Sequence, residues 1–298
     1  MYDVIIIGAG PAGISASLYT VRKNLKTLIM YKEKSALEKA TKIENYYGFE
    51  NGISGKELYT SGINQAKNLG AELLDDEVTD IQMSHISINK ETKKIENITF
   101  KVSTLTKSFE AKSIILATGN KRNKPNIQNI EQFEGKGISY CAVCDGFFYK
   151  NKNVAIIGNG DYAVQEAKNL QNIVKETTIF TNGNPEPKNK IQNIKINTKK
   201  IEAIEGKEKV QAIKFKDGTT QKIDGIFIAE GTAGSTDFAR KLGAKVDKNV
   251  IEVNENMQTS VSGLFACGDC IGGISQIFKN VYEGAKAGIA VANFLTNK

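Results

Sequence analysis

The sequence contains one histidine, His85, and no tryptophan among its 298 residues. His85 stands in the alternating stretch QMSHISINK without an acidic or nucleophilic neighbour of obvious use, so we expect it to be a surface residue. A Ser-His-Asp hydrolase needs a histidine base beside its serine and its acid. The single histidine therefore argues against hydrolysis of that kind.

Long apolar runs are also missing. No stretch approaches the roughly 18 apolar residues of a membrane span, and MYDVIIIGAG has neither a basic region nor a small-residue cleavage site. We therefore expect a cytoplasmic protein with no membrane association. The hydrophobic fraction of 40% is ordinary for a globular chain, and the length favours two domains or one large α/β unit.

Acidic residues are fewer than basic ones, 33 against 40, which gives a formal net charge of +7. The lysines are scattered, and the chain has no basic helix, basic arm or aromatic-studded RNA motif, so we expect no nucleic-acid partner. A solvated lysine-rich surface is the ordinary explanation. An acidic protein partner is the alternative.

Two stretches share the pattern of strand, glycine turn, helix and strand. The first runs from the strand at 2–7 through GAGPAG to the strand at 26–30. The second runs from 152–158 through the helix at 161–172 to the strand at 177–181. Together they predict an α/β chain with two Rossmann-like, three-layer nucleotide-binding domains.

The first glycine turn has G-x-G-x-x-G spacing at Gly8, Gly10 and Gly13. These glycines permit a tight turn, close approach of the backbone to a pyrophosphate, and helix-to-strand packing. The following helix presents free N–H groups to the phosphates. Tyr31 stands where an acidic residue for the ribose is expected, with Glu33 just beyond it.

The rest of the chain predicts an antiparallel ribbon (HISINK and ITFKVS), a buried strand at 113–119, a strand at 261–269 and a helix at 275–295. We expect crossings between domains near 118–120 and 244–246. Residues 1–117 and 246–298 would then form a discontinuous first domain, and residues 118–245 the second.

Four cysteines form two C-x-x-C pairs, Cys141/Cys144 and Cys267/Cys270. In a cytosolic chain this spacing suggests a metal site or a redox dithiol. The pairs lie much farther apart than the roughly 15–20 residues of a zinc ribbon, so we expect no metal. Cysteines at i and i+3 where a helix begins can close a disulfide, and the helix N-terminus favours the reactive thiolate.

Four stretches of the chain carry a resemblance to a known family: YCAVCDGFFYKNKNVAIIGNG, GAGPAG, ATG at 117–119 and GLFACGD. In their order and over essentially the whole chain, they resemble the low-molecular-weight flavoprotein thioredoxin reductases. The resemblance implies an FAD/NAD(P)-linked disulfide reductase fold in a homodimer, with FAD on the first domain and the dithiol on the second. It implies thioredoxin as the substrate. It also implies that Cys141 attacks thioredoxin, that Cys144 lies beside the flavin and that Asp145 is the acid.

The same resemblance identifies the FAD site. Asp269 matches the family's FAD-contacting aspartate, while Asn45 and Gln276 match positions near the flavin ring. Tyr47 replaces a usual proline, so we expect a different local loop. Cys267 and Cys270 fall inside this site and are interpreted as packing residues, with a second redox centre as the alternative. The cofactor-binding residues that we expect are Gly8, Gly10, Pro11, Ala12, Gly13, Asn45, Thr118, Gly119, Gly268, Asp269 and Gln276.

The nicotinamide site has lost its cations. The second turn keeps Gly158, Gly160 and Ala163, but the family's His-Arg-Arg becomes 181–183 (TNG), and a later Arg becomes Pro187. Guanidinium groups are the natural clamp for a 2′-phosphate. The Tyr162 ring could also obstruct the pyrophosphate, whereas the lysines at 188 and 190 could compensate.

This loss resembles the ferredoxin-dependent flavin thioredoxin reductases of anaerobic bacteria, which implies reduced ferredoxin as the electron donor. Three alternatives stay open at this point. They are an NADPH-dependent reductase with an atypical clamp, a flavin-dependent dithiol oxidase and a flavin redox sensor. Ferredoxin-NADP reductases share the fold but lack the C-x-x-C, so Cys141 and Cys144 argue against that class.

Overall fold

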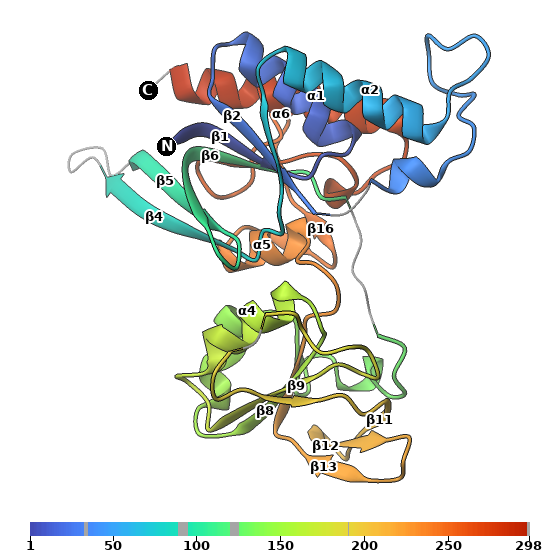
Figure 1. Cartoon of the computed structure of the whole chain (residues 1–298). Coiled ribbons are helices and arrows are strands. Elements are labelled where there is room, and N and C mark those ends of the chain that lie inside the picture. Colours follow the sequence, from blue (N-terminus) through green and yellow to red (C-terminus); the bar gives the residue numbers. More distant parts are fainter. Residues whose placement is uncertain (33–34, 89–94, 120–124, 190, 297–298) are drawn as a thin grey trace. The chain divides into compact units, whose positions relative to one another are not determined.

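The computed structural model describes residues 1–32, 35–88, 95–119, 125–189 and 191–296. The chain folds into two compact units (Figure 1). Unit 1 comprises Met1–Lys121 and Gly234–Lys298, and unit 2 comprises Arg122–Ala233. Each unit contains a sheet with parallel strands together with helices, so the mixed α/β class predicted from the sequence is confirmed.

Unit 1 is built on a seven-stranded sheet in the order β3-β2-β1-β6-β5-β4, with β17 also paired to β6. Its strands are β1 (Tyr2–Ile7), β2 (Thr27–Tyr31), β3 (Glu72–Asp75), β4 (Asp80–Ile88), β5 (Ile95–Ser103), β6 (Ser108–Leu116) and β17 (Leu264–Ala266). Strand β1 pairs in parallel with β2 and β6, and β4, β5 and β6 pair antiparallel. The end of β1 is apolar and fully buried, as expected for a central parallel strand.

Helices α1 (Pro11–Arg22), α2 (Gly55–Asn68) and α6 (Ile277–Thr296) lie together on one side of this sheet (Figure 1). Small residues let α1 and α6 approach closely. A Cβ at Gly284 would lie 2.1 Å from the Ala12 carbonyl oxygen, and one at Gly288 would lie 2.4 Å from the Ala16 oxygen. No helix in the described ranges, α6 included, is long and apolar enough to cross a membrane.

Residues 234–245 belong to unit 1, whereas the sequence suggested the second domain. This segment contains α5 (Ser235–Lys241), which packs against β4 and against the short hairpin of β15 (Val246–Asp247) and β16 (Val250–Ile251). Phe238, in the middle of α5, is fully buried. The return of the chain to unit 1 therefore precedes α5 because its apolar face needs this partner.

Unit 2 has a five-stranded parallel sheet in the order β10-β9-β8-β14-β7 and a three-stranded antiparallel sheet, β11-β12-β13. The strands are β7 (Ile138–Ser139), β8 (Asn153–Ile157), β9 (Glu176–Phe180), β10 (Lys195–Asn197), β11 (Ile201–Gly206), β12 (Val210–Phe215), β13 (Thr220–Lys222) and β14 (Gly225–Ile228). Helix α4 (Asp161–Leu170) follows β8, and the one-turn helix α3 (Ala142–Asp145) follows β7. The core joins the two sheets through the stacked rings of Phe180 and Phe215.

Candidate functional site

The first glycine turn has the geometry of a pyrophosphate cradle. Gly8 has a φ of +112°, and a Cβ there would lie 2.4 Å from the Ala117 carbonyl oxygen. A Cβ at Gly13 would lie 1.9 Å from the oxygen of Gly8. Helix α1 begins after Gly10, which has no side chain to occupy the helix's amide donors, with Pro11 in its first turn. The amides at this helix end can therefore receive phosphate oxygens.

The turn after β17 supplies an acidic side chain that lacks a partner. Asp269 begins the 3-10 helix η4 (Asp269–Ile271), and Gly268 before it has a φ of +83°. Within the described residues the Asp269 Oδ1 atom is buried without a hydrogen-bond donor, as is the Asn280 Oδ1 atom. Buried polar atoms in native proteins are almost always bonded, so both oxygens fit a hydroxyl-bearing ligand such as the FAD ribityl chain.

A buried ion pair fixes this turn to α6. The Glu283 carboxylate accepts a hydrogen bond from the Gly268 N–H at 3.0 Å. Lys279 donates to the Gly268 carbonyl at 3.1 Å and pairs with Glu283 at 3.0 Å. Because both backbone polar groups of Gly268 are engaged by α6, the position of Asp269 is set by the helix. Sequence reasoning missed Lys279 and Glu283, which stand in a helix without a motif.

The remaining predicted cofactor residues lie on three segments of unit 1. Asn45 and Gln276 are far apart in sequence, yet the Asn45 amide nitrogen donates to the Gln276 amide oxygen at 3.2 Å. Thr118, after β6, exchanges hydrogen bonds with Ser235 at the start of α5. Gly119 has a φ of +75° and open space at its Cβ position. Tyr47 is almost fully exposed, and Glu33 lies outside the described residues.

Cys267 and Cys270, beside this cradle, are free thiols with no exposed surface. The Cys270 Sγ donates to the carbonyl of Cys267 at 3.3 Å. Burial raises the pKa of Cys267 and raises the pKa of Cys270 to about 12. Buried protonated thiols are poor nucleophiles, which favours the packing role over a second redox centre. Among the described residues no group of three His, Cys, Asp or Glu side chains could hold a metal ion.

In unit 2, Cys141 and Cys144 form a disulfide with a Cα–Cα distance of 5.3 Å. Cys141 caps the N-terminus of α3 and is 4% exposed, whereas Cys144 is exposed. The Cys144 N–H donates to the Cys141 Sγ at 3.2 Å. This donor would stabilise a thiolate on Cys141, while the exposed Cys144 is the sulfur that another molecule reaches more easily.

Ser139 ties the acid Asp145 to the disulfide turn. Its hydroxyl donates to the Asp145 carboxylate at 2.6 Å and accepts from the Cys141 N–H at 3.1 Å. Asp145 is half-buried at the end of α3, directly after Cys144. The carboxyl group is therefore held within one residue of the disulfide, where it can exchange a proton with a sulfur. Ser139 belongs to no sequence motif that we recognised.

Exposed apolar side chains flank Cys144 in the sequence. Val143, Phe147 and Phe148 are 56%, 74% and 71% exposed. Large apolar residues in such a group commonly mark a protein interaction surface. They form the apolar ridge of unit 2.

The second glycine turn keeps its shape but not its polarity. A Cβ at Gly158 would lie 2.0 Å from the Ala229 carbonyl oxygen, so β8 and β14 meet as closely as in a working cradle. Asp161 now begins α4, where a phosphate would bind. Glu230 follows β14 at the same edge of the sheet, and burial raises its carboxyl pKa. The Asp161 carboxylate therefore opposes the binding of a phosphate at this helix end.

The segment after β9, where the cationic clamp would stand, is folded on itself. Thr181 and Asn184 exchange hydrogen bonds of 2.6 and 2.8 Å between side chains and carbonyls. Asn182 is 5% exposed, and its amide oxygen accepts from the Ile201 N–H at 3.1 Å. Gly183 packs against the aliphatic part of Lys200. These side chains are part of the fold and are not directed at a ligand.

Two further contacts join this segment to the glycine turn. The Asn189 amide donates to the Asp161 carboxylate at 2.9 Å, and the Asn159 amide donates to the Pro185 carbonyl at 3.4 Å. The Tyr162 ring is buried and its hydroxyl donates to the Tyr140 carbonyl, so the expectation that it obstructs the cradle is wrong. Lys188 is described, and Lys190 lies outside the described residues.

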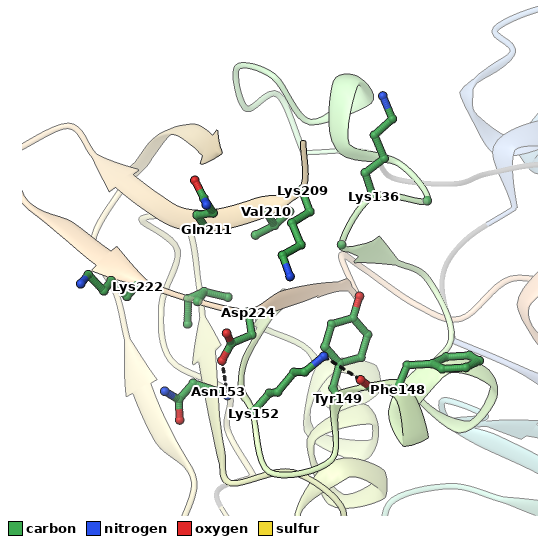
Figure 2. A pocket seen from close by; sticks show the side chains of 13 residues that line it. Lys136, Phe148, Tyr149, Lys152, Asn153, Lys209, Val210, Gln211, Lys222 and Asp224 are labelled. Carbon is green, nitrogen blue, oxygen red and sulfur yellow. Dashed lines mark hydrogen bonds between the residues drawn. The ribbon is translucent and has the colours of Figure 1, made fainter. Parts of the chain in front are cut away.

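Unit 2 also contains a cavity of about 610 Å³ with a basic lining, shown in Figure 2. Lys209 extends its amine into the cavity, whereas the Lys152 amine lies beside the Tyr149 ring and donates to the Phe148 carbonyl at 3.0 Å. Asp224 is the single acidic residue of the lining, and it accepts a hydrogen bond from the Asn153 N–H. Phe148, from the apolar ridge, stands at its rim, so a basic surface adjoins the ridge.

A two-unit fold with one cofactor cradle and a redox-competent disulfide defines a flavoprotein disulfide reductase. Residues 2–288 match the family model described as pyridine nucleotide-disulphide oxidoreductase, and the chain belongs to this family. Within it the chain is a thioredoxin reductase flavoprotein, and FAD is its cofactor.

Three relatives carry this assignment. The thioredoxin reductase of Aquifex aeolicus is 36% identical, with 100% of this chain and 94% of that protein covered. The crystal structure of the atypical thioredoxin reductase from Desulfovibrio vulgaris Hildenborough has a TM-score of 0.89 at 35% identity, covering 100% of this chain and 99% of that one. The ferredoxin-flavin thioredoxin reductase of Clostridium acetobutylicum has a TM-score of 0.68 at 29% identity, covering 100% and 99%.

Proposed function

We propose that this chain reduces thioredoxin through the Cys141–Cys144 dithiol, and that its electrons come from reduced ferredoxin and not from a nicotinamide cofactor. The observation that carries the choice of donor is the burial of Thr181 and Asn182. The Thr181 hydroxyl donates to the Asn184 carbonyl, and the Asn182 amide oxygen accepts from the Ile201 N–H, so the side chains at two positions of the cationic clamp bond to unit 2 itself. Each missing charge-assisted hydrogen bond to the 2′-phosphate weakens the binding of NADPH by about 1.5–3 kcal/mol.

The thiol chemistry follows from the geometry of α3. Cys141, stabilised by the Cys144 N–H, is our choice for the sulfur that attacks the thioredoxin disulfide, and Cys144 is our choice for the sulfur that receives electrons. In the oxidised turn Cys144 is the more exposed of the two, so Cys141 must become accessible before it attacks. Asp145, held by Ser139, supplies or accepts the proton at the sulfur.

Docking of the substrate is assigned to the apolar ridge and the basic cavity beside it. Val143, Phe147 and Phe148 would cover apolar surface of the partner, while Lys152 and Lys209 would attract acidic side chains. FAD, when bound, supplies the conversion of single electrons into a two-electron transfer. A homodimer is expected from the family resemblance, and light scattering would test it by a mass twice the 32.6 kDa of the chain.

Ferredoxin is also a sufficient reductant. A plant-type ferredoxin near about −400 mV and a thioredoxin near about −270 mV differ by roughly 130 mV, or about 6 kcal/mol for two electrons. The lysine excess of this chain suits an acidic protein donor through electrostatic steering. The name of the Clostridium acetobutylicum relative, a ferredoxin-flavin thioredoxin reductase, adds support.

An anaerobic flavin titration distinguishes the donors. The loaded enzyme is mixed separately with NADPH, NADH and reduced ferredoxin, and oxidised thioredoxin is then added. We expect flavin bleaching only with ferredoxin, followed by reoxidation with thioredoxin. Rapid bleaching by micromolar NADPH would contradict the proposal that ferredoxin is the electron donor. Peroxide formation that depends on a small dithiol would indicate an oxidase, and an absence of turnover would indicate a sensor.

A further inference from the structure

A buried carboxylate from α4 lies directly behind the disulfide turn. Glu166 is 1% exposed, and its Oε2 accepts a hydrogen bond from the Ala142 N–H at 2.8 Å. Ala142 is the residue bonded to Cys141. The other carboxylate oxygen, Oε1, accepts from the Asn169 side-chain amide at 3.3 Å. The carboxylate therefore connects the helix of the second glycine turn to the redox pair.

Core packing does not explain an acid at this position. Its neighbours on the buried face of α4, Ala163, Ala167 and Leu170, are apolar and fully buried. Glutamate is rarely fully buried because removing its charge from water is costly unless strong hydrogen bonds compensate. An apolar residue would continue the pattern of this face. The carboxylate therefore has a role through its contacts, among them the Ala142 amide.

The charge of Glu166 acts on the two redox states unequally. Reduction breaks the S–S bond and takes up two electrons and two protons to give two thiols. A thiol that then ionises places a negative charge on sulfur, and Cys141 is the buried member of the pair. The Glu166 carboxylate is bonded to the amide of the residue that follows Cys141. Its negative charge raises the free energy of a Cys141 thiolate but not that of the uncharged disulfide. The carboxylate therefore opposes the stabilisation that the Cys144 N–H gives to a Cys141 thiolate, and it favours the disulfide over the dithiol.

We propose that Glu166 is a positioning residue that holds the turn at 141–145 and, through its charge, shifts the Cys141–Cys144 pair toward the disulfide. The dithiol becomes a stronger reductant as a result. This inference rests on the proposed function, because it concerns the same redox pair.

The test is a redox equilibrium of the FAD-loaded protein against a reference dithiol, dithiothreitol. Its two thiols give up two electrons and two protons and close to a ring disulfide as the protein disulfide opens. Alkylation and mass spectrometry report the reduced fraction. The variants are Glu166→Gln, which keeps an acceptor for Ala142 but loses the charge, and Asn169→Asp, which adds a carboxylate beside Glu166. Glu176→Gln, at the surface of unit 2, is the matched control for loss of charge.

We expect Glu166→Gln to shift the equilibrium toward the dithiol by about tenfold, equivalent to about 30 mV for two electrons. Asn169→Asp should shift it toward the disulfide by at least about threefold, and Glu176→Gln should stay within about twofold of the unmodified protein. If Glu166→Gln does not fold, as judged by circular dichroism and flavin content, the direction of Asn169→Asp decides.

The outcomes separate this inference from the proposed function. If the unmodified disulfide is not reduced by dithiothreitol at all, the redox role of the pair is wrong. If it is reduced but both variants stay within about twofold of it, the role of Glu166 alone is wrong.

Discussion

Unit 1 and unit 2 each contain a glycine turn and a C-x-x-C pair, but the surroundings of the two turns and of the two pairs differ. In unit 1 the turn opens onto orphaned polar atoms such as Asp269 Oδ1, and the cysteines are buried and protonated. In unit 2 the glycine turn is followed by Asp161, which accepts a hydrogen bond from Asn189 in the segment after β9. Cys144 of unit 2 is exposed. Under the proposed function, unit 1 holds the cofactor and unit 2 holds the reactive dithiol.

This difference teaches that neither motif predicts a function by its spacing alone. Gly8 and Gly158 both lie so close to the carbonyl of the residue after a neighbouring strand that a Cβ would clash with its oxygen, so both turns are closely packed. Ligand binding is decided by side chains about twenty residues further along, which neutralise or repel phosphate charge. Cysteine reactivity is likewise decided by burial and by nearby N–H donors.

The largest expected effect is on thioredoxin turnover and comes from comparing the two cysteine pairs. Cys144→Ser should lower thioredoxin turnover by at least about ten-thousandfold, because the dithiol cannot close to a disulfide. Flavin reduction by ferredoxin should persist. Cys270→Ser is the matched control and should keep turnover within about threefold. A Cys144→Ser protein with normal turnover would contradict the dithiol route.

The next largest effect concerns the two glycine turns. Gly13→Ala would place a Cβ 1.9 Å from the Gly8 oxygen and separate α1 from β1. We expect FAD affinity to fall by about a thousandfold, or about 4 kcal/mol, measured as flavin retained per chain. Ala163→Gly, at the corresponding position of the second turn, should leave flavin content unchanged. Equal flavin in both variants would mean that the first turn does not hold the cofactor.

The sequence predicted the two βαβ units well because apolar strands bounded by glycine turns have a strong period and a strong stop signal. It also found the C-x-x-C at 141–144, the turn at Asp269, and Asn45 with Gln276, which the fold brings together. It could not find Ser139, Glu166 or Lys279. A polar residue in a helix or at a strand end is normally exposed, and only tertiary packing reveals that these three are not.

The boundary before α5 was missed for a related reason. Nothing local distinguishes a helix that packs on unit 1 from one that packs on unit 2, because its partners, β4 and β16, come from both before and after it in the sequence. The position of Tyr162 also depended on tertiary structure. Its ring is buried inside unit 2, where its hydroxyl reaches the Tyr140 carbonyl at 3.5 Å.

A moderate effect on stability is expected from substitutions of Asn182, in the segment after β9. Asn182→Ala removes the acceptor of the buried Ile201 N–H and should cost about 1–3 kcal/mol of unfolding free energy. Asn182→Asp keeps the oxygen and should cost less. Urea unfolding measures both, and neither variant should change flavin bleaching by NADPH. A stable Asn182→Ala protein that gained NADPH activity would show that the segment still borders a nicotinamide site.

The smallest effect is a pH dependence that belongs to the inert cysteines. The pKa of Cys270 is about 12 in the folded protein against an ordinary value of 9.0, so the folded state holds its proton where the unfolded chain has lost it. The stabilisation is complete below pH 9 and is lost as pH rises toward 12. Between about pH 9 and pH 10, urea unfolding should show the disulfide-intact protein losing about 1 kcal/mol more than Cys270→Ala. Equal slopes would mean that Cys270 is more open to solvent than its burial indicates, which would make the two pairs alike.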